Sequence, residues 1–231
     1  MAVDIEILKT LCDFNGHEYE SKKGHDYLDA LRKVFSLDNT NDNPFTIEDI
    51  LLQPELCEFS FSGLEEYKYI CKLKVQPMII TSSNKRINER IFPEDFDSED
   101  AKKVFYQSLG VSYLLTCPYQ GKEYIIKIGS SRTTFEKRLG SYNCGVVNNW
   151  RTASTTNIKI LQSMVTNRAT LNLYLVDCSH DPYILKWHGV ESVPFASPKA
   201  LAIEDIMIKQ FISQFGKKPL ANIQASATEV G

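Results

Sequence analysis

A carboxylate lies among apolar side chains near the end of the sequence. Between Ser197 and Gly216 apolar residues recur at helical spacing, and Glu204 falls within their stripe rather than opposite it. The stripe comprises Leu201, Ile208, Phe211 and Phe215, with Met207 beside it. Burying a carboxylate without a partner is costly, so we expect Glu204 to pair with a cation such as Arg138, to bind a metal ion or to accept several hydrogen bonds. Asp205, the next residue, is expected to face solvent.

A second pair of polar residues shares one face of a predicted helix. Thr133 and Glu136 have the spacing of a capping box, which predicts the start of that helix. Arg138 and Tyr142 are four residues apart, so their side chains project from neighbouring turns toward one place. Alone, an arginine beside an apolar helical face usually forms a surface ion pair. The motifs elsewhere in the chain therefore decide its role.

The same half of the chain carries a longer series of motifs. In sequence order they are Tyr113, Lys127-Ile128-Gly129, Arg138, Tyr142, Glu204 and Pro219-Leu-Ala-Asn222. The series resembles the GIY-YIG nuclease superfamily, in which two hairpin strands carry the GIY and YIG tripeptides, a helix carries an arginine and a later helix carries a metal-binding glutamate. The first tripeptide reads Val111-Ser112-Tyr113 here and keeps only its tyrosine. The second resembles the Lys-Ile-Gly form of the phage-type branch, and residues 179–197 look like an insertion.

The resemblance implies a catalytic set and a metal ion. The set comprises Tyr113, Lys127, Arg138, Tyr142 and Glu204. Glu204 would hold one Mg²⁺ (or Mn²⁺), an ion that keeps much of its water shell. Arg138 would bind the non-bridging phosphate oxygens, and Lys127 would stabilise charge or contact the DNA backbone. Tyr113 or Tyr142 would serve as the general base or position the attacking water, and the sequence does not separate the two.

Two further residues have structural roles in this interpretation. Gly129 ends the second tripeptide, and Asn222 is expected to orient Glu204 or the end of the chain rather than to touch DNA. The residues expected to contact DNA are Lys122, Ser130, Ser131, Arg132, Lys137, Arg151 and Lys159. Binding through such contacts should weaken as the salt concentration rises.

Six predicted elements would position these residues. Two β-prone runs at 112–117 and 124–128 flank a hairpin connection. The capped helix follows, then a helical stretch at 157–165, an alternating strand around residues 171–175 and the last helix at 197–216. The order β-β-α-α-β-α predicts an α/β (α+β) fold with a small central antiparallel sheet.

The two halves of the sequence differ in charge. Residues 1–108 hold 13 Lys and Arg against 21 Asp and Glu, a net charge of -8, whereas residues 109–231 hold 13 against 8, a net charge of +5. We therefore predict a mixed α/β accessory or recognition domain at 1–108 and a GIY-YIG-like nuclease domain at 109–231, with the basic half binding the polyanion. In the first half we expect a helix at 25–37, a short helix after Thr46 and a half-exposed strand at 67–75, with Tyr67, Tyr69 and Cys71 on one face.

Composition is that of an ordinary soluble globular protein. Hydrophobic residues make up 43% and charged residues 24% of the sequence, and no apolar run approaches the length of a membrane span. The first residues lack the features of a signal peptide, so we expect a cytoplasmic protein with no membrane partner. The six cysteines are scattered without a close pair, which favours reduced and mostly buried thiols.

These observations favour a divalent-metal-dependent endonuclease that acts on double-stranded DNA, and most specifically a type II restriction endonuclease. Two alternatives stay open: a phage, homing or repair-type GIY-YIG nuclease, and a catalytically idle nucleic-acid-binding or protein-interaction domain. The presence of Tyr113, Arg138 and Glu204 argues against the idle domain. A single active site cuts one strand, so cleavage of both strands would require a homodimer or two successive visits.

Overall fold

The computed structural model describes residues 45–77, 89–143, 160, 163–164, 167–180, 183–194 and 197–223. The chain divides into two compact units. The first comprises Met1–Ile47, Lys74–Phe92 and Gly140–Ala169, and the second comprises Glu48–Leu73, Pro93–Leu139 and Thr170–Gly231. Each unit includes residues from both sides of Ser108, after which the change of charge suggested a boundary. A division of roles between a recognition part and a nuclease part stays a prediction.

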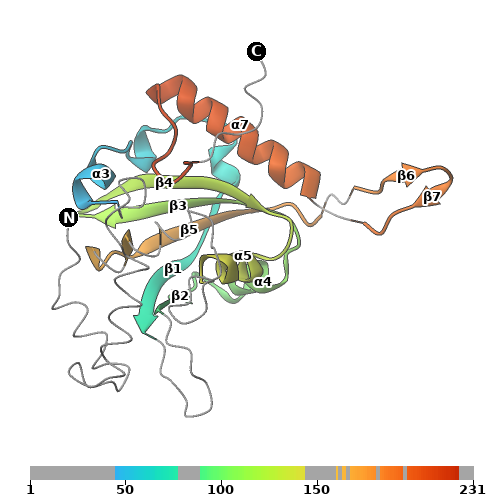
Figure 1. The fold of residues 1–231 in the computed structure, drawn as a ribbon, viewed down its shortest axis with the longest axis horizontal. Helices are drawn as coiled ribbons and strands as arrows, with labels where there is room; N and C mark the ends of the chain where they lie inside the picture. Colours follow the sequence, from blue (N-terminus) through green and yellow to red (C-terminus); the bar gives the residue numbers. More distant parts are fainter. Residues whose placement is uncertain are drawn as a thin grey trace, which may run out of the picture. The chain divides into compact units, whose positions relative to one another are not determined.

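The central sheet has five strands in the order β2-β1-β5-β3-β4. Its strands are β1 (Lys68–Pro77), β2 (Glu89–Glu94), β3 (Val111–Tyr119), β4 (Lys122–Ser131) and β5 (Leu171–Asp177). β3 pairs antiparallel with both β4 and β5, and β5 pairs antiparallel with β1. The antiparallel sheet with its helices confirms the predicted α+β class (Figure 1). Because β1 and β2 precede Ser108, the sheet draws on both halves of the sequence.

β3 and β4 form the predicted hairpin. Its turn is Gln120-Gly121, with φ angles of 50° and 78°. Two consecutive residues with positive φ give a turn whose twist matches that of the strands it joins, so the ladder continues up to the turn on both sides. At the other end of the hairpin, Tyr113 is paired with Gly129 and Ser112 with Ser130.

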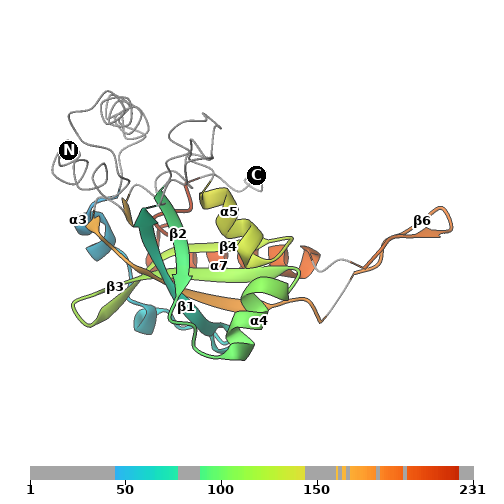
Figure 2. The ribbon, with the colours of Figure 1, turned by 90° about the horizontal axis from the view of Figure 1, so that it is seen from below.

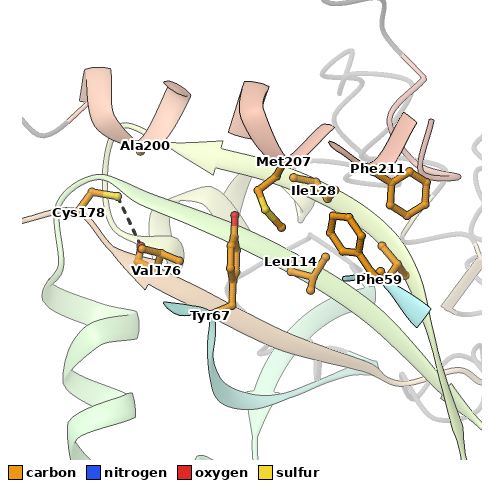
Figure 3. Close-up of a cluster of buried hydrophobic side chains, with 10 residues drawn as sticks. Phe59, Tyr67, Leu114, Ile128, Val176, Cys178, Ala200, Met207 and Phe211 are labelled. Carbon is orange, nitrogen blue, oxygen red and sulfur yellow. Dashed lines mark hydrogen bonds between the residues drawn. The ribbon is translucent and has the colours of Figure 1, made fainter. Parts of the chain in front are cut away.

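Helices cover both faces of the β3–β4 hairpin. α7 (Ser197–Phe215) lies against one face, whereas α4 (Glu99–Gln107) and the start of α5 (Phe135–Tyr142) lie on the other (Figures 1 and 2). Under α7 the buried cluster contains Phe59, Tyr67, Leu114, Ile125, Ile128, Val176, Cys178, Ala200, Met207 and Phe211 (Figure 3). On the opposite face Phe135 contacts Phe105 and Tyr113, with ring centroids 5.5 and 5.2 Å away.

The buried stripe of α7 differs by one residue from the predicted one. Ala200, Met207 and Phe211 are fully buried, whereas Leu201 is 41% exposed. The prediction for Leu201 was wrong because the small Ala200 side chain faces the sheet and turns its neighbour outward. Glu204 still falls within the stripe, because positions 200, 204, 207 and 211 follow one another at helical spacing along a single face. Gly216, with φ of 66°, ends the helix as predicted.

Two other local predictions need correction. Tyr69 of β1 is only half-buried and Ile70 is buried, because an irregularity in the β1–β5 register between Tyr69 and Cys71 interrupts the expected alternation. The cap of α5 is Thr134 rather than Thr133, since the Thr134 hydroxyl accepts the N–H of Lys137 at 3.3 Å. The correction moves the start of the helix by one residue and leaves Phe135 and Leu139 buried as predicted.

The remaining described elements are short. They are α3 (Ile47–Leu51), the 3₁₀ helices η1 (Leu56–Glu58) and η2 (Leu64–Glu66), and the strands β6 (Lys186–Trp187) and β7 (Val190–Glu191), which pair with each other. α3 confirms the predicted short helix after Thr46. The helix expected at 25–37 lies outside the described residues, and the stretch at 157–165 lies mostly outside them. Among the described cysteines, Cys71, Cys117 and Cys178 are buried free thiols as expected, whereas Cys57 is exposed.

Candidate active site

Tyr113 and Gly129 form the floor of the site. They are paired across β3 and β4, and the Tyr113 ring is fully buried over the Gly129 backbone. A Cβ atom at position 129 would lie 2.7 Å from Cε2 of Tyr113 and closer still to Cζ and the hydroxyl oxygen. Only glycine leaves room for the ring here, because carbon atoms normally stay about 3.5 Å apart or more. The third residue of the Lys127-Ile128-Gly129 motif therefore sets the position of the tyrosine.

Arg138 holds the hydroxyl group of Tyr113. The Arg138 Nε–H donates to the Tyr113 hydroxyl oxygen at 3.2 Å, and the guanidinium carbon lies 5.9 Å from the ring centroid. The start of α5 fixes this position, since Thr134 caps the helix and its carbonyl accepts the Arg138 N–H at 3.2 Å. On the ring side, Phe135 packs edge-on against Tyr113. A positively charged N–H donor at a phenol oxygen stabilises negative charge on that oxygen.

Lys127 places a second positively charged group, beside Arg138, in the buried part of the site. Its side chain is 7% exposed, and its Nζ donates to the carbonyl of Ala221 at 3.0 Å. The pKa of Lys127 is lowered to about 8, chiefly by burial and also by the nearby charge of Arg138, and Glu204 opposes both effects. The ammonium group therefore interacts with both Arg138 and Glu204. Near neutral pH a small fraction of Lys127 is uncharged and able to accept a proton.

Glu204 reaches the end of β4 from α7. The Ser130 hydroxyl donates a hydrogen bond to Oε2 of Glu204, and the glutamate is half-buried. A partner of the Glu204 carboxylate is thus a hydroxyl group. Hydrogen bonds were one of the three kinds of partner that the sequence left open, beside a cation and a metal ion. Asp205 forms an ion pair with Lys209 at 2.7 Å, and its side chain is 44% exposed. The two neighbouring carboxylates therefore differ in environment, which makes Asp205 a matched control for Glu204.

Asn222 fastens the chain end to β4. Its Nδ2 donates to the carbonyl of Ile128 at 2.8 Å, and its Oδ1 accepts the Ile128 N–H at 3.1 Å. Beside it, the Ala221 N–H donates to the carbonyl of Ile126 at 2.9 Å. Both hydrogen bonds of the Asn222 side chain thus go to the backbone that carries Lys127 and Gly129. This geometry supports the orienting role expected for Asn222.

The second unit thus gathers Tyr113, Lys127, Arg138 and Glu204 around one end of the β3–β4 hairpin. Tyr142 is buried, with 1% exposure, and belongs to the first unit, so it is not counted with these four. Its role as an alternative base stays a prediction.

The residues predicted to contact DNA fall into different places. Arg132 and Lys137 are exposed near the site. Lys122 pairs with Glu55 at the far end of β4, about 26 Å from Ser130 at roughly 3.3 Å per residue. Ser131 is buried and its Oγ accepts the Thr133 N–H at 3.2 Å, so we assign it to the turn rather than to DNA. Arg151 and Lys159 lie outside the described residues.

Two polar residues at the site were missed in the sequence. Ser112 is fully buried next to Ser130, and the Tyr67 hydroxyl lies 2.6 Å from its Oγ. The sequence contained one usable signal, a serine between Val111 and Tyr113 in a run of β3 that is mostly apolar. No pattern indicated that Tyr67, 45 residues earlier, would meet it.

The donor atoms fit a hard metal ion. The Glu204 carboxylate, which accepts the Ser130 hydroxyl proton, offers oxygen atoms, the ligands that Mg²⁺ and Mn²⁺ accept while they keep most of their water. Across the described ranges, no three His, Cys, Asp or Glu side chains gather to hold an ion by themselves.

Comparison with known proteins adds one likeness. No family model matches the chain, and no curated protein matches it. Among solved structures, "Restriction endonuclease HPY188I in complex with product DNA" is similar at 21% identity and a TM-score of 0.46, over 81% of this chain and 97% of that chain. A likeness of this degree does not establish a shared activity. Within the described residues, no helix has the length and apolar character to cross a membrane.

Proposed function

We propose that this protein is a divalent-metal-dependent endonuclease that hydrolyses phosphodiester bonds in double-stranded DNA. The observation that carries the proposal is the contact between the Arg138 guanidinium and the Tyr113 hydroxyl, at 3.2 Å over Gly129. Lys127, a buried ammonium group, interacts both with Arg138 of this pair and with the half-buried carboxylate of Glu204. Phosphodiester hydrolysis requires an activated water, positive charge at the phosphate oxygens and help for the leaving oxygen, and a phenol, two cations and a metal-binding carboxylate can supply these.

In the proposed reaction, a water oxygen bonds to phosphorus as the bond from phosphorus to the 3′ oxygen breaks. Tyr113 accepts or directs the proton that the water loses, and the departing 3′ oxygen gains a proton. Arg138 neutralises the non-bridging oxygens, because its planar fork of N–H donors matches their geometry. Lys127 adds positive charge next to Arg138 and Glu204. Glu204 would hold Mg²⁺ (or Mn²⁺), which when bound supplies Lewis-acid stabilisation of the developing negative charge.

We propose, more narrowly, that the enzyme is a type II restriction endonuclease. The support is the combination of a compact candidate site with chain segments that the site does not use, including α3 and the β6–β7 hairpin. Such segments can recognise a sequence or bring a second copy into contact. Cleavage of both strands would then come from a homodimer with one site for each strand.

The test is incubation of the full chain with plasmid and phage DNA in Mg²⁺, with a chelator in parallel reactions. A discrete set of fragments that disappears with the chelator would support a restriction endonuclease. A continuous smear would support a nuclease of relaxed specificity instead. If DNA is bound but never cut in Mg²⁺ or Mn²⁺, the nuclease proposal fails and the chain is a binding module.

A further inference from the structure

Two serine side chains lie next to each other beneath Glu204. Ser112 of β3 and Ser130 of β4 are directly paired, on the face of the hairpin that α7 covers. Ser130 donates to Oε2 of Glu204. Ser130 was expected to contact DNA, whereas in the structure its hydroxyl donates to a carboxylate of the same chain.

The hydroxyl groups form a chain with a fixed direction. Ser112 donates to the carbonyl of Gly129 at 3.3 Å, and a serine hydroxyl has only one proton to give. At the 2.6 Å contact between Ser112 and Tyr67, the donor must therefore be the Tyr67 hydroxyl. Burial raises the pKa of Tyr67 well above its usual range, so this phenol keeps its proton at any ordinary pH. The Tyr67–Ser112–Gly129 chain thus holds the backbone just before Ser130.

We infer that Ser130 is the positioning residue of the metal-binding carboxylate, and that its hydrogen bond to Oε2 leaves Oε1 to meet the metal ion. The inference rests on the proposed nuclease function. A glutamate on a helix has three side-chain torsions, and a carboxylate held at one oxygen loses much of that freedom before the ion arrives. Partners that orient a metal ligand commonly contribute about 10–100-fold to metal affinity or activity.

Removal of the hydroxyl tests the inference. Ser130→Ala deletes one oxygen atom, Ser130→Thr keeps the donor, and Ser213→Ala makes the same deletion at an exposed position further along α7. The first readout is the affinity for Mn²⁺ without DNA, measured by electron paramagnetic resonance on the full chain. The second is the Mg²⁺ concentration that gives half-maximal cleavage, and the third is DNA affinity in a chelator. Thermal unfolding checks that each variant is folded.

We expect Ser130→Ala to weaken Mn²⁺ binding by about 10–100-fold and to raise the half-maximal Mg²⁺ concentration similarly, with DNA affinity unchanged. Ser130→Thr should restore most of the loss, and Ser213→Ala should match the wild type. Tyr67→Phe, which removes the far end of the hydroxyl chain, should shift Mn²⁺ affinity in the same direction by less. If Ser130→Ala proves unstable, Tyr67→Phe and Ser130→Thr carry the comparison.

Three outcomes separate this inference from the function on which it rests. If the wild type cuts DNA and Glu204→Gln does not, but Ser130→Ala binds Mn²⁺ normally, the positioning role is wrong and the nuclease stands. If Ser130→Ala loses DNA affinity and keeps Mn²⁺ affinity, Ser130 contacts DNA and the inference is again overturned. If the wild type neither cuts DNA nor binds Mn²⁺ through Glu204, the proposed function itself has failed.

Discussion

The replacement of Gly129 by alanine is the sharpest test of the site, because the added methyl group would meet the Tyr113 ring. The new Cβ would lie 2.7 Å from Cε2 of Tyr113 and nearer to its Cζ and hydroxyl oxygen. Carbon atoms in contact stay about 3.5–4.0 Å apart, so the ring must retreat by about 1 Å. The ring is fully buried with Phe135 packed against it, so it has no free direction in which to swing.

The retreat should affect stability and activity together. Overpacking of this size costs about 1–3 kcal/mol in the free energy of unfolding. A retreat of about 1 Å would also lengthen the 3.2 Å contact between Arg138 Nε and Tyr113 beyond hydrogen-bonding distance. Misplacing a catalytic group by about 1 Å can lower the rate about 100-fold. We therefore expect Gly129→Ala to be less stable than the wild type and about 100 times slower in cleavage.

Gly140 provides a matched control within α5. A Cβ atom at position 140 would meet no atom within 4 Å, so Gly140→Ala should stabilise the helix by about 0.5–1 kcal/mol. Urea unfolding gives the stabilities of both variants, and plasmid cleavage in Mg²⁺ gives the rates. If Gly129→Ala unfolds and cuts like Gly140→Ala, the Tyr113 ring does not depend on a glycine beneath it, and the site geometry described above is wrong.

Four further substitutions test the other residues of the site and a control residue beside it. Glu204→Gln should lower the cleavage rate in Mg²⁺ by at least about a thousandfold, roughly 4 kcal/mol of transition-state stabilisation, and keep DNA affinity in a binding assay. Asp205→Asn should cut normally because that carboxylate pairs with Lys209, and equal cutting by both variants would make Glu204 structural. Lys127 has a folded-state pKa of about 8 against an unfolded value of about 10.5, so the folded state binds fewer protons between these pH values and stability rises with pH there. We therefore compare the unfolding free energy of Lys127→Met with that of the wild type by urea unfolding. The difference, variant minus wild type, should fall by about 3 kcal/mol between pH 7 and pH 10.5. A difference that does not change with pH would refute the buried charge. Asn222→Ala should cost about 2 kcal/mol in the same measurement, since two hydrogen bonds to Ile128 are lost at about 1 kcal/mol each, and an unchanged midpoint would show that the chain end is held by other contacts.

Patterns within a few residues predicted most of the local structure. Alternation and turn residues gave the β3–β4 hairpin, and the alternating leucines gave β5. Helix punctuation gave the end of α7 at Gly216. Each of these signals depends on the backbone geometry of one element, which is why sequence spacing alone was sufficient.

Errors appeared where one element meets another. The alternation in β1 failed at Ile70, which is buried, because a register irregularity against β5 interrupts it, and the register depends on the partner strand. Leu201 was assigned to the core because its size suggests burial, yet the close approach of α7 to the sheet favours the smaller Ala200. The Ser130–Glu204 contact could not be predicted either, since it requires α7 to dock at a specific rotation over β4.

The outer edge of β4 explains why the site depends on distant parts of the chain. β4 is the last strand of the sheet, and an edge strand exposes unpaired N–H and C=O groups. Here the Ile125 N–H donates to the carbonyl of Pro54, and Ile128 exchanges two hydrogen bonds with the side chain of Asn222. Between them, Lys127 reaches past the edge to the carbonyl of Ala221. The contacts that close this edge therefore also hold the buried ammonium group in place, so the position of Lys127 depends on the segment that follows α7 as well as on β4.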